Sequence, residues 1–260
     1  FGLGYTGQYI ARALTRAGWE IGGTTRQDDL KTALQAEGIK AVGFEGVSRD
    51  HLKKYGQVLS TIGPMRDQDH DLDPVLSQFA DVIASAKPRW VGYFSATSVY
   101  GAADEDAWVD EAFPTNPTTS RGKRRLAVEQ QWADWASQHQ LPLSRFRIAG
   151  IYGPGRNILE QLTAGTARIV EKPGHVFNRV HVEDIARAVT YRMIDPKHAT
   201  IDNLADGQPL SQKDWVTKAA AILGIDPPQP IPYDEAAEDM SPMGRSFWQD
   251  SKRIKAPDFA

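Results

Sequence analysis

Hydrophobic residues follow two different spacings along the chain. Short apolar runs, typical of buried strands, alternate with longer segments that carry apolar residues three and four positions apart, as amphipathic helices do. The runs that predict strands cover residues 19–24, 39–44, 57–62, 90–95 and 143–148. The segments that predict helices cover residues 8–17, 29–37, 74–86, 121–139 and 182–194. This alternation predicts an α/β protein with a Rossmann-type doubly wound parallel sheet.

The pattern changes after residue 150. Ser211 and Asp214 form a capping box that begins a further helix, and Gly224 ends it. A segment with four prolines, 226–232, leads into a polar tail, 233–260, for which no clear final element is expected. We therefore expect a dinucleotide-binding domain and a small C-terminal substrate lobe. The first comprises residues 1–150 with 178–206 returning to it, and the second comprises 151–177 and 207–260.

The chain opens on a glycine-rich turn. Gly2, Gly4 and Gly7 form G-x-G-x-x-G directly before the first predicted helix. Such a turn brings backbone N–H groups, here those of Gly4, Tyr5, Thr6 and Gly7, to the pyrophosphate of a dinucleotide at a helix N-terminus. A plain strand-to-helix turn is the alternative. No apolar strand precedes the turn, so we expect the sequence to be a fragment that lacks its first strand.

The ends of two predicted strands supply further cofactor candidates. After the second strand come Thr25 and Arg26, at the place where an arginine accommodates the 2′-phosphate of NADP and an acidic residue selects NAD. This favours NADP over NAD, and a solvated loop charge is the alternative for Arg26. Thr61 and Ile62 end the strand before Gly63-Pro64, at the edge where ligands of open α/β sheets bind.

Composition excludes several classes of function. The 260 residues are 41% hydrophobic, and 30 basic against 33 acidic residues give a net charge of -3, so we expect neither nucleic acid nor an anionic membrane as a partner. Zero cysteines exclude disulfides and thiolate metal sites. No metal site is expected, because His175 and His181 lack ligand spacing and are interpreted as structural. We expect a soluble, cytoplasmic monomer or homodimer.

Four later motifs carry a resemblance to a known family. They are the S-x-x-x-V-Y-G turn at 95–101, the W-V-D-E loop at 108–111, the R-x-x-x-x-Y-G-P-G turn at 147–155 and the H-V-x-D-I-A segment at 181–186. With the opening turn, they resemble the extended short-chain dehydrogenase/reductase family of the NAD-dependent epimerase/dehydratase type. The similarity is greatest to its uncharacterised epimerase-like branch with a G-x-G-Y-T-G opening.

The resemblance implies hydride chemistry, but this chain departs from the family's catalytic pattern. The family uses a Ser or Thr on the V-Y-G turn and a Y-x-x-x-K pair on the next helix, whose tyrosine is the acid/base. Here these positions hold Ala96, Arg121 and Arg125. Arg121 cannot exchange a proton at neutral pH, whereas Arg125 retains donors for a ribose hydroxyl. Thr97 or Ser98 is expected to supply a hydroxyl in place of the missing serine.

Further site residues follow from the resemblance. It places Ser95, Arg125 and Ile151 at the cofactor and Arg156, Phe177 and Arg179 at the substrate. Arginines at these positions suggest an anionic small-molecule substrate, with surface salt bridging as the alternative for each. The basic run at 121–125 is interpreted as a solvated or anion-binding helix face and not as a nucleic-acid site.

Two functional hypotheses remain. The first is an NADP- or NAD-dependent oxidoreductase or epimerase/dehydratase-like enzyme, whose substrate is small, polyhydroxylated and either free or nucleotide-linked. In it, Thr97 or Ser98 and Arg121 polarise a carbonyl group. The second is a catalytically silent NADP-binding sensor or scaffold. The sequence does not specify the substrate or the direction of hydride transfer.

Overall fold

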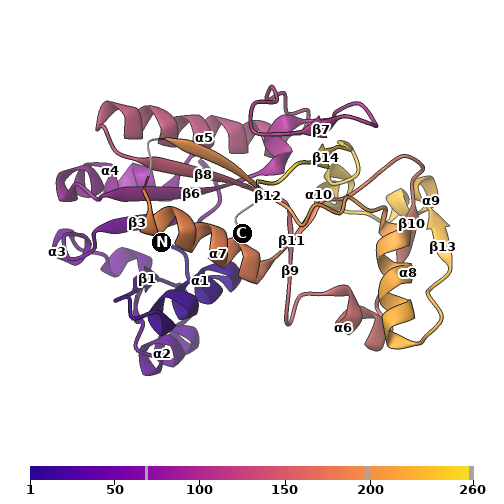
Figure 1. Ribbon diagram of the computed structural model, residues 1–260, viewed down its shortest axis with the longest axis horizontal. Coiled ribbons are helices and arrows are strands. Elements are labelled where there is room, and N and C mark those ends of the chain that lie inside the picture. The colour runs from indigo at the N-terminus through magenta and orange to yellow at the C-terminus, as the bar shows by residue number, and fades with distance from the viewer. Residues whose placement is uncertain (68–69, 197–198, 258–260) are drawn as a thin grey trace.

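A parallel sheet forms the centre of the protein. The structure, a computed structural model, describes residues 1–67, 70–196 and 199–257. Four parallel strands lie in the order β12 (Thr200–Leu204), β8 (Leu143–Ile148), β6 (Trp90–Ala96) and β3 (Gln57–Ser60). Their non-sequential order requires crossovers, and the helices that make them cover both faces of the sheet (Figure 1). The expected Rossmann-type α/β fold is therefore confirmed.

A second parallel pair, β1 (Gly22–Thr24) and β2 (Lys40–Val42), lies beside β3 without pairing to it. Residues 1–3 lie between the two sheets. Phe1 donates its amine to the Leu59 carbonyl at 2.6 Å, and Leu3 N donates to the Thr24 carbonyl at 2.7 Å. A mainly apolar cavity of about 380 Å³ extends from there between the inner edges of β1 and β3. Residues 1–3 thus connect the two sheets by hydrogen bonds to both.

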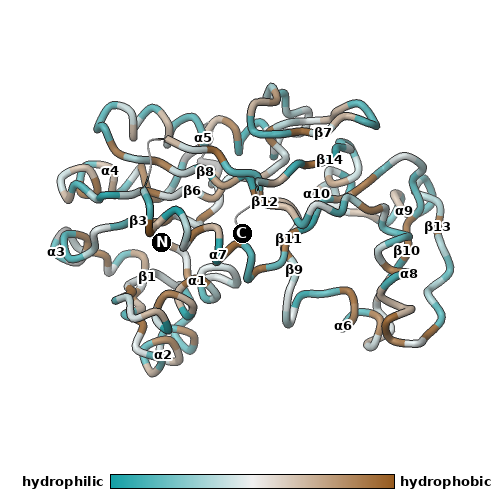
Figure 2. Tube along the Cα trace, viewed as in Figure 1, coloured by the Kyte–Doolittle hydropathy of each residue, from teal (hydrophilic) through white to brown (hydrophobic). Residues whose placement is uncertain are grey.

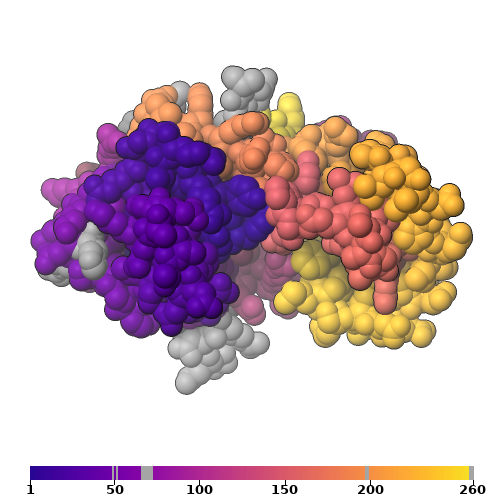
Figure 3. Space-filling model, turned by 90° about the horizontal axis from the view of Figure 1, so that it is seen from below, coloured from indigo at the N-terminus to yellow at the C-terminus, as the bar shows by residue number. Residues whose placement is uncertain are grey.

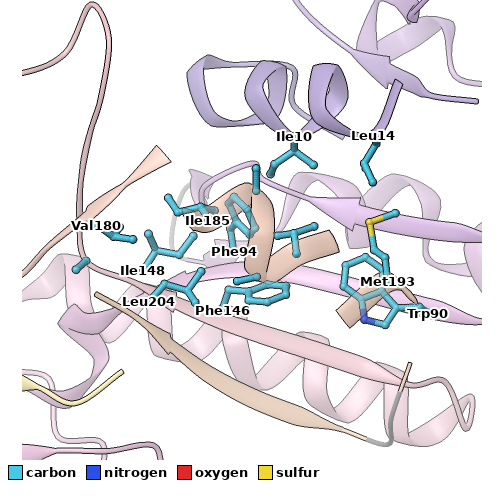
Figure 4. Packing of buried hydrophobic residues seen from close by; sticks show 14 residues of the cluster. Ile10, Leu14, Trp90, Phe94, Phe146, Ile148, Val180, Ile185, Met193 and Leu204 are labelled. Atoms are coloured by element: carbon cyan, nitrogen blue, oxygen red, sulfur yellow. The ribbon is translucent and has the colours of Figure 1, made fainter. Parts of the chain in front are cut away.

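Helices form a layer on each face of the central sheet. On one face lie α1 (Tyr5–Arg16) and α7 (Val182–Ile194), and on the other α4 (Pro74–Ala86) and α5 (Ser120–Gln138). Ile10 and Leu14 of α1 point from their helix toward the aromatic residues of β6 and β8, among them Trp90 and Phe146 (Figure 4). Hydrophobic and hydrophilic segments alternate along α5 (Figure 2), as expected for a helix with one face on a sheet.

A smaller lobe packs around its own hydrophobic cluster. It is built from α6 (Ile158–Thr163), β10 (Ile169–Glu171), α8 (Gln212–Leu223), β13 (Pro230–Pro232) and α9 (Tyr233–Glu238), with α10 (Pro242–Ser246) toward the sheet. Leu162, Ile169 and Val216 belong to its core. Figure 3 shows the indigo N-terminal residues and the yellow C-terminal residues at opposite ends of the molecule. The division into two domains expected from the sequence stays a prediction.

The remaining elements are short. Strand β9 (Gly150–Tyr152) pairs in parallel with β11 (Arg179–His181), β7 (Trp108–Val109) with β14 (Arg253–Ile254), and β4 (Met65–Asp67) in antiparallel orientation with β5 (His70–Leu72). The other helices are α2 (Asp28–Ala36) and the one-turn α3 (Arg49–Leu52), and η1 (Phe44–Gly46) and η2 (Thr97–Tyr100) are 3-10 turns. Within the described ranges, no helix is long and apolar enough to cross a membrane.

The tail departs from the sequence expectation. Residues 233–260 were expected to lack a clear final element, yet they contain α9, α10 and β14. Ile254 is fully buried with Val99, Tyr100 and Val109, so this part of the tail packs on the segment that follows β6. The side-chain amide of Asn203 makes hydrogen bonds to three segments that meet here. It accepts from the Tyr100 hydroxyl at 2.8 Å and donates to the carbonyls of Val109 and Lys255 at 3.3 and 3.2 Å.

Candidate active site

A cleft of about 460 Å³ lies at the carboxyl ends of the central strands. Regions distant in sequence surround it, among them the glycine turn, the ends of β6 and β8, the start of α5, and the tail. The lining residues that concern the chemistry are Gly4, Tyr5, Thr6, Gly7, Thr61, Ser95, Ala96, Thr97, Ser98, Arg121, Arg125, Ile151, Arg156, Phe177, Phe247, Asp250 and Lys252. Most sequence-predicted site residues are therefore brought together in one place.

The three glycines of the opening turn have different surroundings. Gly2 has a φ of +91°, a backbone conformation that residues with a side chain rarely adopt. At Gly7, a Cβ atom would lie 2.2 Å from the Gly2 carbonyl oxygen, so only glycine lets α1 pack onto the turn. At Gly4, a Cβ atom would meet nothing within 4 Å. Gly4 is the N-cap of α1, and no side chain caps the helix there, so its first N–H groups remain available to a ligand.

Thr61 and Ile62 support this turn. The Thr61 hydroxyl donates to the Phe1 and Gly2 carbonyls at 3.1 and 2.6 Å, and a Cβ on Gly2 would lie 2.5 Å from that oxygen. Ile62 packs on the same glycine and on the hydrophobic cluster beside β3, away from the cleft lining. Thr61 therefore lines the cleft itself, whereas Ile62 can affect the cleft only by its contact with Gly2.

Helix α5 presents two arginines to the cleft from successive turns. Arg125 donates to the Phe94 carbonyl at 2.8 Å and the Tyr93 hydroxyl at 3.2 Å, so its guanidinium is fixed at the end of β6. Arg121 lies with Cζ 4.8 Å from the centre of the Phe247 ring. Burial and the charge of Arg125 lower the Arg121 pKa below its usual value. An anion entering the cleft would relieve this repulsion.

The turn η2 carries the hydroxyl candidates. Ala96 stands at its N-cap, followed by Thr97 and Ser98, and all three line the cleft. The Ser98 oxygen is buried and has no hydrogen-bond partner within the part of the chain that the structure describes. A ligand hydroxyl or carbonyl could satisfy it.

Ser95 lines the cleft and is held from below by a buried network. Its hydroxyl donates to Glu129, which is 1% exposed and lies in α5. Arg147 donates to the same carboxylate from β8 through Nη2 at 2.6 Å and Nε at 3.2 Å, and its Cζ lies 4.7 Å from the centre of the Tyr100 ring. This buried network joins β6, β8 and α5 beneath the cleft. Tyr100 is thereby held in a structural role.

The substrate candidates divide into two groups. Arg156 and Phe177 line the cleft, and Arg156 lies with Cζ 5.8 Å from the Tyr5 ring centre. Arg179 lies outside the lining, with Cζ 4.4 Å from the centre of the Trp215 ring and Nη1 3.2 Å from the Phe177 carbonyl oxygen. Burial lowers the pKa of Arg179 to about 10. Arg179 is therefore placed to support Phe177 from behind.

The adenosine-side candidates lie at the end of β1. Thr25 Oγ1 accepts from Gln27 N at 3.3 Å, and Arg26 is exposed. Neither lines the cleft. Their assignment to the cofactor stays a prediction.

One side of the cleft is formed by the tail, which the sequence did not predict. Phe247, Asp250 and Lys252 line the cleft, although the tail carried no recognisable motif. The available signal was a pair of aromatic residues, Phe247 and Trp248, within an otherwise polar stretch. Among the residues described here, no group of three His, Asp or Glu side chains could hold a metal ion.

Comparison with known proteins finds a family match for the central part of the chain. Residues 77–200 match the NAD dependent epimerase/dehydratase family, and the glycine turn, sheet order and cleft all agree with that match. This central part of the chain is therefore similar to the family. Across 242 residues it is 29% identical to "Protein YeeZ" of Escherichia coli K12, covering 88% of this chain and 84% of that protein.

Two solved structures extend the comparison. A functionally unknown conserved protein from Silicibacter pomeroyi DSS is 40% identical, with a TM-score of 0.87 over 98% of this chain and 88% of that one. MoeE5, in complex with UDP-glucose and NAD, is 18% identical, with a TM-score of 0.71 over 98% of this chain and 86% of that one. The second similarity concerns the fold alone.

Proposed function

We propose that this protein is a member of the epimerase/dehydratase family that binds NADP, or less strongly NAD, across the carboxyl ends of its sheet. In this proposal it acts as an oxidoreductase or epimerase on a small, polyhydroxylated, anionic substrate, nucleotide-linked sugars included. The observation that carries the proposal is the uncapped N-terminus of α1 with its open Gly4, in the same cleft as the two α5 arginines.

The residues present fit a dinucleotide. The bare side of Gly4 leaves room for a pyrophosphate against the N–H groups that begin α1, where the helix dipole favours negative charge. In this proposal Arg125 would donate to a ribose hydroxyl, with Ser95 and Ile151 in the same cleft lining, and Arg26 would bind the 2′-phosphate. The nicotinamide supplies reversible hydride transfer when it is bound.

The charges of the cleft support an anionic substrate. Arg121, Arg125, Arg156 and Lys252 face it, against the single acidic side chain Asp250 among the described lining residues. Guanidinium groups bind phosphate and carboxylate through paired N–H donors. The fold relatives include MoeE5 in complexes with UDP-glucose and UDP-glucuronic acid. Thr97 or Ser98, with Arg121, would bind and polarise the substrate's carbonyl oxygen.

Cofactor titration tests the proposal. NADPH and NADH are titrated into the wild type and Gly4→Ala while nicotinamide fluorescence is recorded. The new methyl group has room in the protein but would occupy the pyrophosphate position, so affinity should fall at least about tenfold with an unchanged melting temperature. Gly56→Ala is the matched control, because its Cβ makes an ordinary contact at 3.8 Å outside the cleft lining. Wild-type protein that binds neither nucleotide would refute the proposal.

The replaced catalytic positions favour a second candidate, a silent NADP-binding sensor or scaffold. Ala96, Arg121 and Arg125 stand where the family carries its serine, tyrosine and lysine. This candidate predicts cofactor binding without NADPH oxidation across a panel of sugar nucleotides and aldehydes. It also predicts a protein partner whose affinity changes with NADPH. The silent candidate would be excluded if the wild type turned over any substrate of the panel and the Gly4→Ala variant did not.

A further inference from the structure

The tail places one lysine, Lys252, in the wall of the cleft. Asn178 holds the backbone directly after it, donating to the Lys252 carbonyl at 2.9 Å and accepting from Ile254 N at 2.8 Å. Val176 N donates to the Ser251 hydroxyl at 3.1 Å, and β14 then pairs with β7. The chain around Lys252 is therefore fixed by contacts to two separate segments.

Few of the cleft's described side chains can exchange a proton near neutral pH. The arginines remain protonated. The Tyr5 hydroxyl donates to the Pro154 carbonyl at 3.0 Å, and burial raises the Tyr5 pKa further above its usual value. Asp250 accepts from the Thr118 hydroxyl at 2.6 Å. Lys252 is the candidate that remains.

The surroundings of Lys252 suit proton transfer. The residue is 8% exposed, and its ammonium has no hydrogen bond or ion pair to any residue that the structure describes. Burial lowers the pKa of Lys252, and the Asp250 carboxylate partly opposes this shift. Lys172 and His175 lie on the loop beside it, and Arg121 and Arg125 of α5 line the same cleft.

We propose that Lys252 is the proton-transfer residue of the cleft, replacing the acid/base that the α5 arginines cannot provide. The inference rests on the proposed function. In reduction, the Lys252 ammonium would give its proton to the substrate's carbonyl oxygen, while the carbonyl carbon would take the hydride that a bound reduced nicotinamide supplies. The products are an alcohol, the oxidised nucleotide and a neutral amine, which regains its proton from water. Oxidation is the reverse.

Competitive acetylation of the apo protein tests the lysine without requiring turnover. Trace acetic anhydride is applied from pH 6 to 11, and the labelling of each lysine is quantified by peptide mass spectrometry. Lys252 should become reactive at a lower pH than the exposed Lys255 on the same segment. NADPH together with UDP-glucuronic acid, as a probe for the cleft, should protect Lys252 and leave Lys255 unchanged. A Lys252 that never labels, or that titrates together with the surface lysines, would overturn the proposal.

Variants separate this inference from the proposed function. Lys252→Met should retain NADPH affinity but lose turnover of any reduced substrate by about 100-fold or more, the usual contribution of a general acid. Lys252→Arg keeps the charge and should be equally slow, because it cannot exchange its proton at neutral pH. Lys255→Met is the control. Normal turnover and pH profile in both Lys252 variants would refute the lysine role alone, whereas absent cofactor binding in the wild type would refute the proposed function.

Discussion

Replacing Glu129 by Gln should show how strongly the buried network beneath the cleft stabilises the fold. The change removes one negative charge and keeps the side-chain shape. Glu129 is 1% exposed and its main partner Arg147 is 4% exposed, with a second arginine, Arg145, at 3.7 Å. The substitution leaves two largely buried guanidinium groups without their counter-charge.

The magnitude follows from burial. Removing one partner of a buried ion pair costs about 3–5 kcal/mol, because the remaining charge stays desolvated. In a protein of this size each kcal/mol lowers the melting temperature by about 2–4 °C, so Glu129→Gln should lower it by roughly 6–20 °C. Replacement of an exposed pair should cost less than about 1 kcal/mol.

The measurement is urea unfolding at pH 7 followed by tryptophan fluorescence, supported by calorimetry. Glu37→Gln is the matched control, because Arg12 also donates two hydrogen bonds to that carboxylate, at 2.6 and 2.8 Å, but both side chains are more than a third exposed. Equal destabilisation by the two substitutions would refute the argument from burial. Recovery of stability in Glu129→Gln at high salt would refute it as well.

Three further outcomes are expected. Gly7→Ala should lower both the melting temperature and NADPH affinity, because its Cβ would lie 2.2 Å from the Gly2 oxygen; retention of either property would count against the assigned packing. Burial lowers the pKa of His175 from 6.5 to about 4, so the unfolded state takes up the proton first and stability falls as pH drops from 6.5 toward 4. His175→Phe should show a smaller loss of unfolding free energy between pH 7 and 4.5 than the wild type, and an equal loss would refute it. Arg26→Ala should weaken binding of NADPH but not of NADH, measured by fluorescence titration.

The regular elements could be predicted from sequence because local signals determine them. Helix α4 begins and ends where the proline and the apolar spacing indicated, and the Ser211–Asp214 box begins α8 with a hydrogen bond of 3.0 Å. The glycine turn was recognisable because its backbone requirements restrict the residue type. The strand at 19–24 shortened to β1, since three of its residues lie outside the ladder with β2.

The tail and the support of the cleft could not be predicted, because both depend on contacts between distant segments. Nothing near Lys252 in sequence indicates that Asn178 will hold it, and nothing near Ser95 indicates Glu129 as its partner. The position of Arg179 in the sequence suggested that it binds the substrate. In the structure its guanidinium instead stacks on Trp215, a residue 36 positions away that the local sequence does not indicate. Composition and periodicity contain no information on such pairs.

The amide of Asn203 has a consequence for how the protein folds. It connects Tyr100, Val109 and Lys255, partners that lie 103, 94 and 52 positions away in the chain. Contacts of such separation form late, because the intervening chain must lose its entropy first. The strand–helix units should therefore regain secondary structure before the tail docks on β7. In refolding experiments, the far-ultraviolet signal should recover before the ability to bind a nucleotide, because the cleft gains the wall formed by Phe247, Asp250 and Lys252 only when the tail docks.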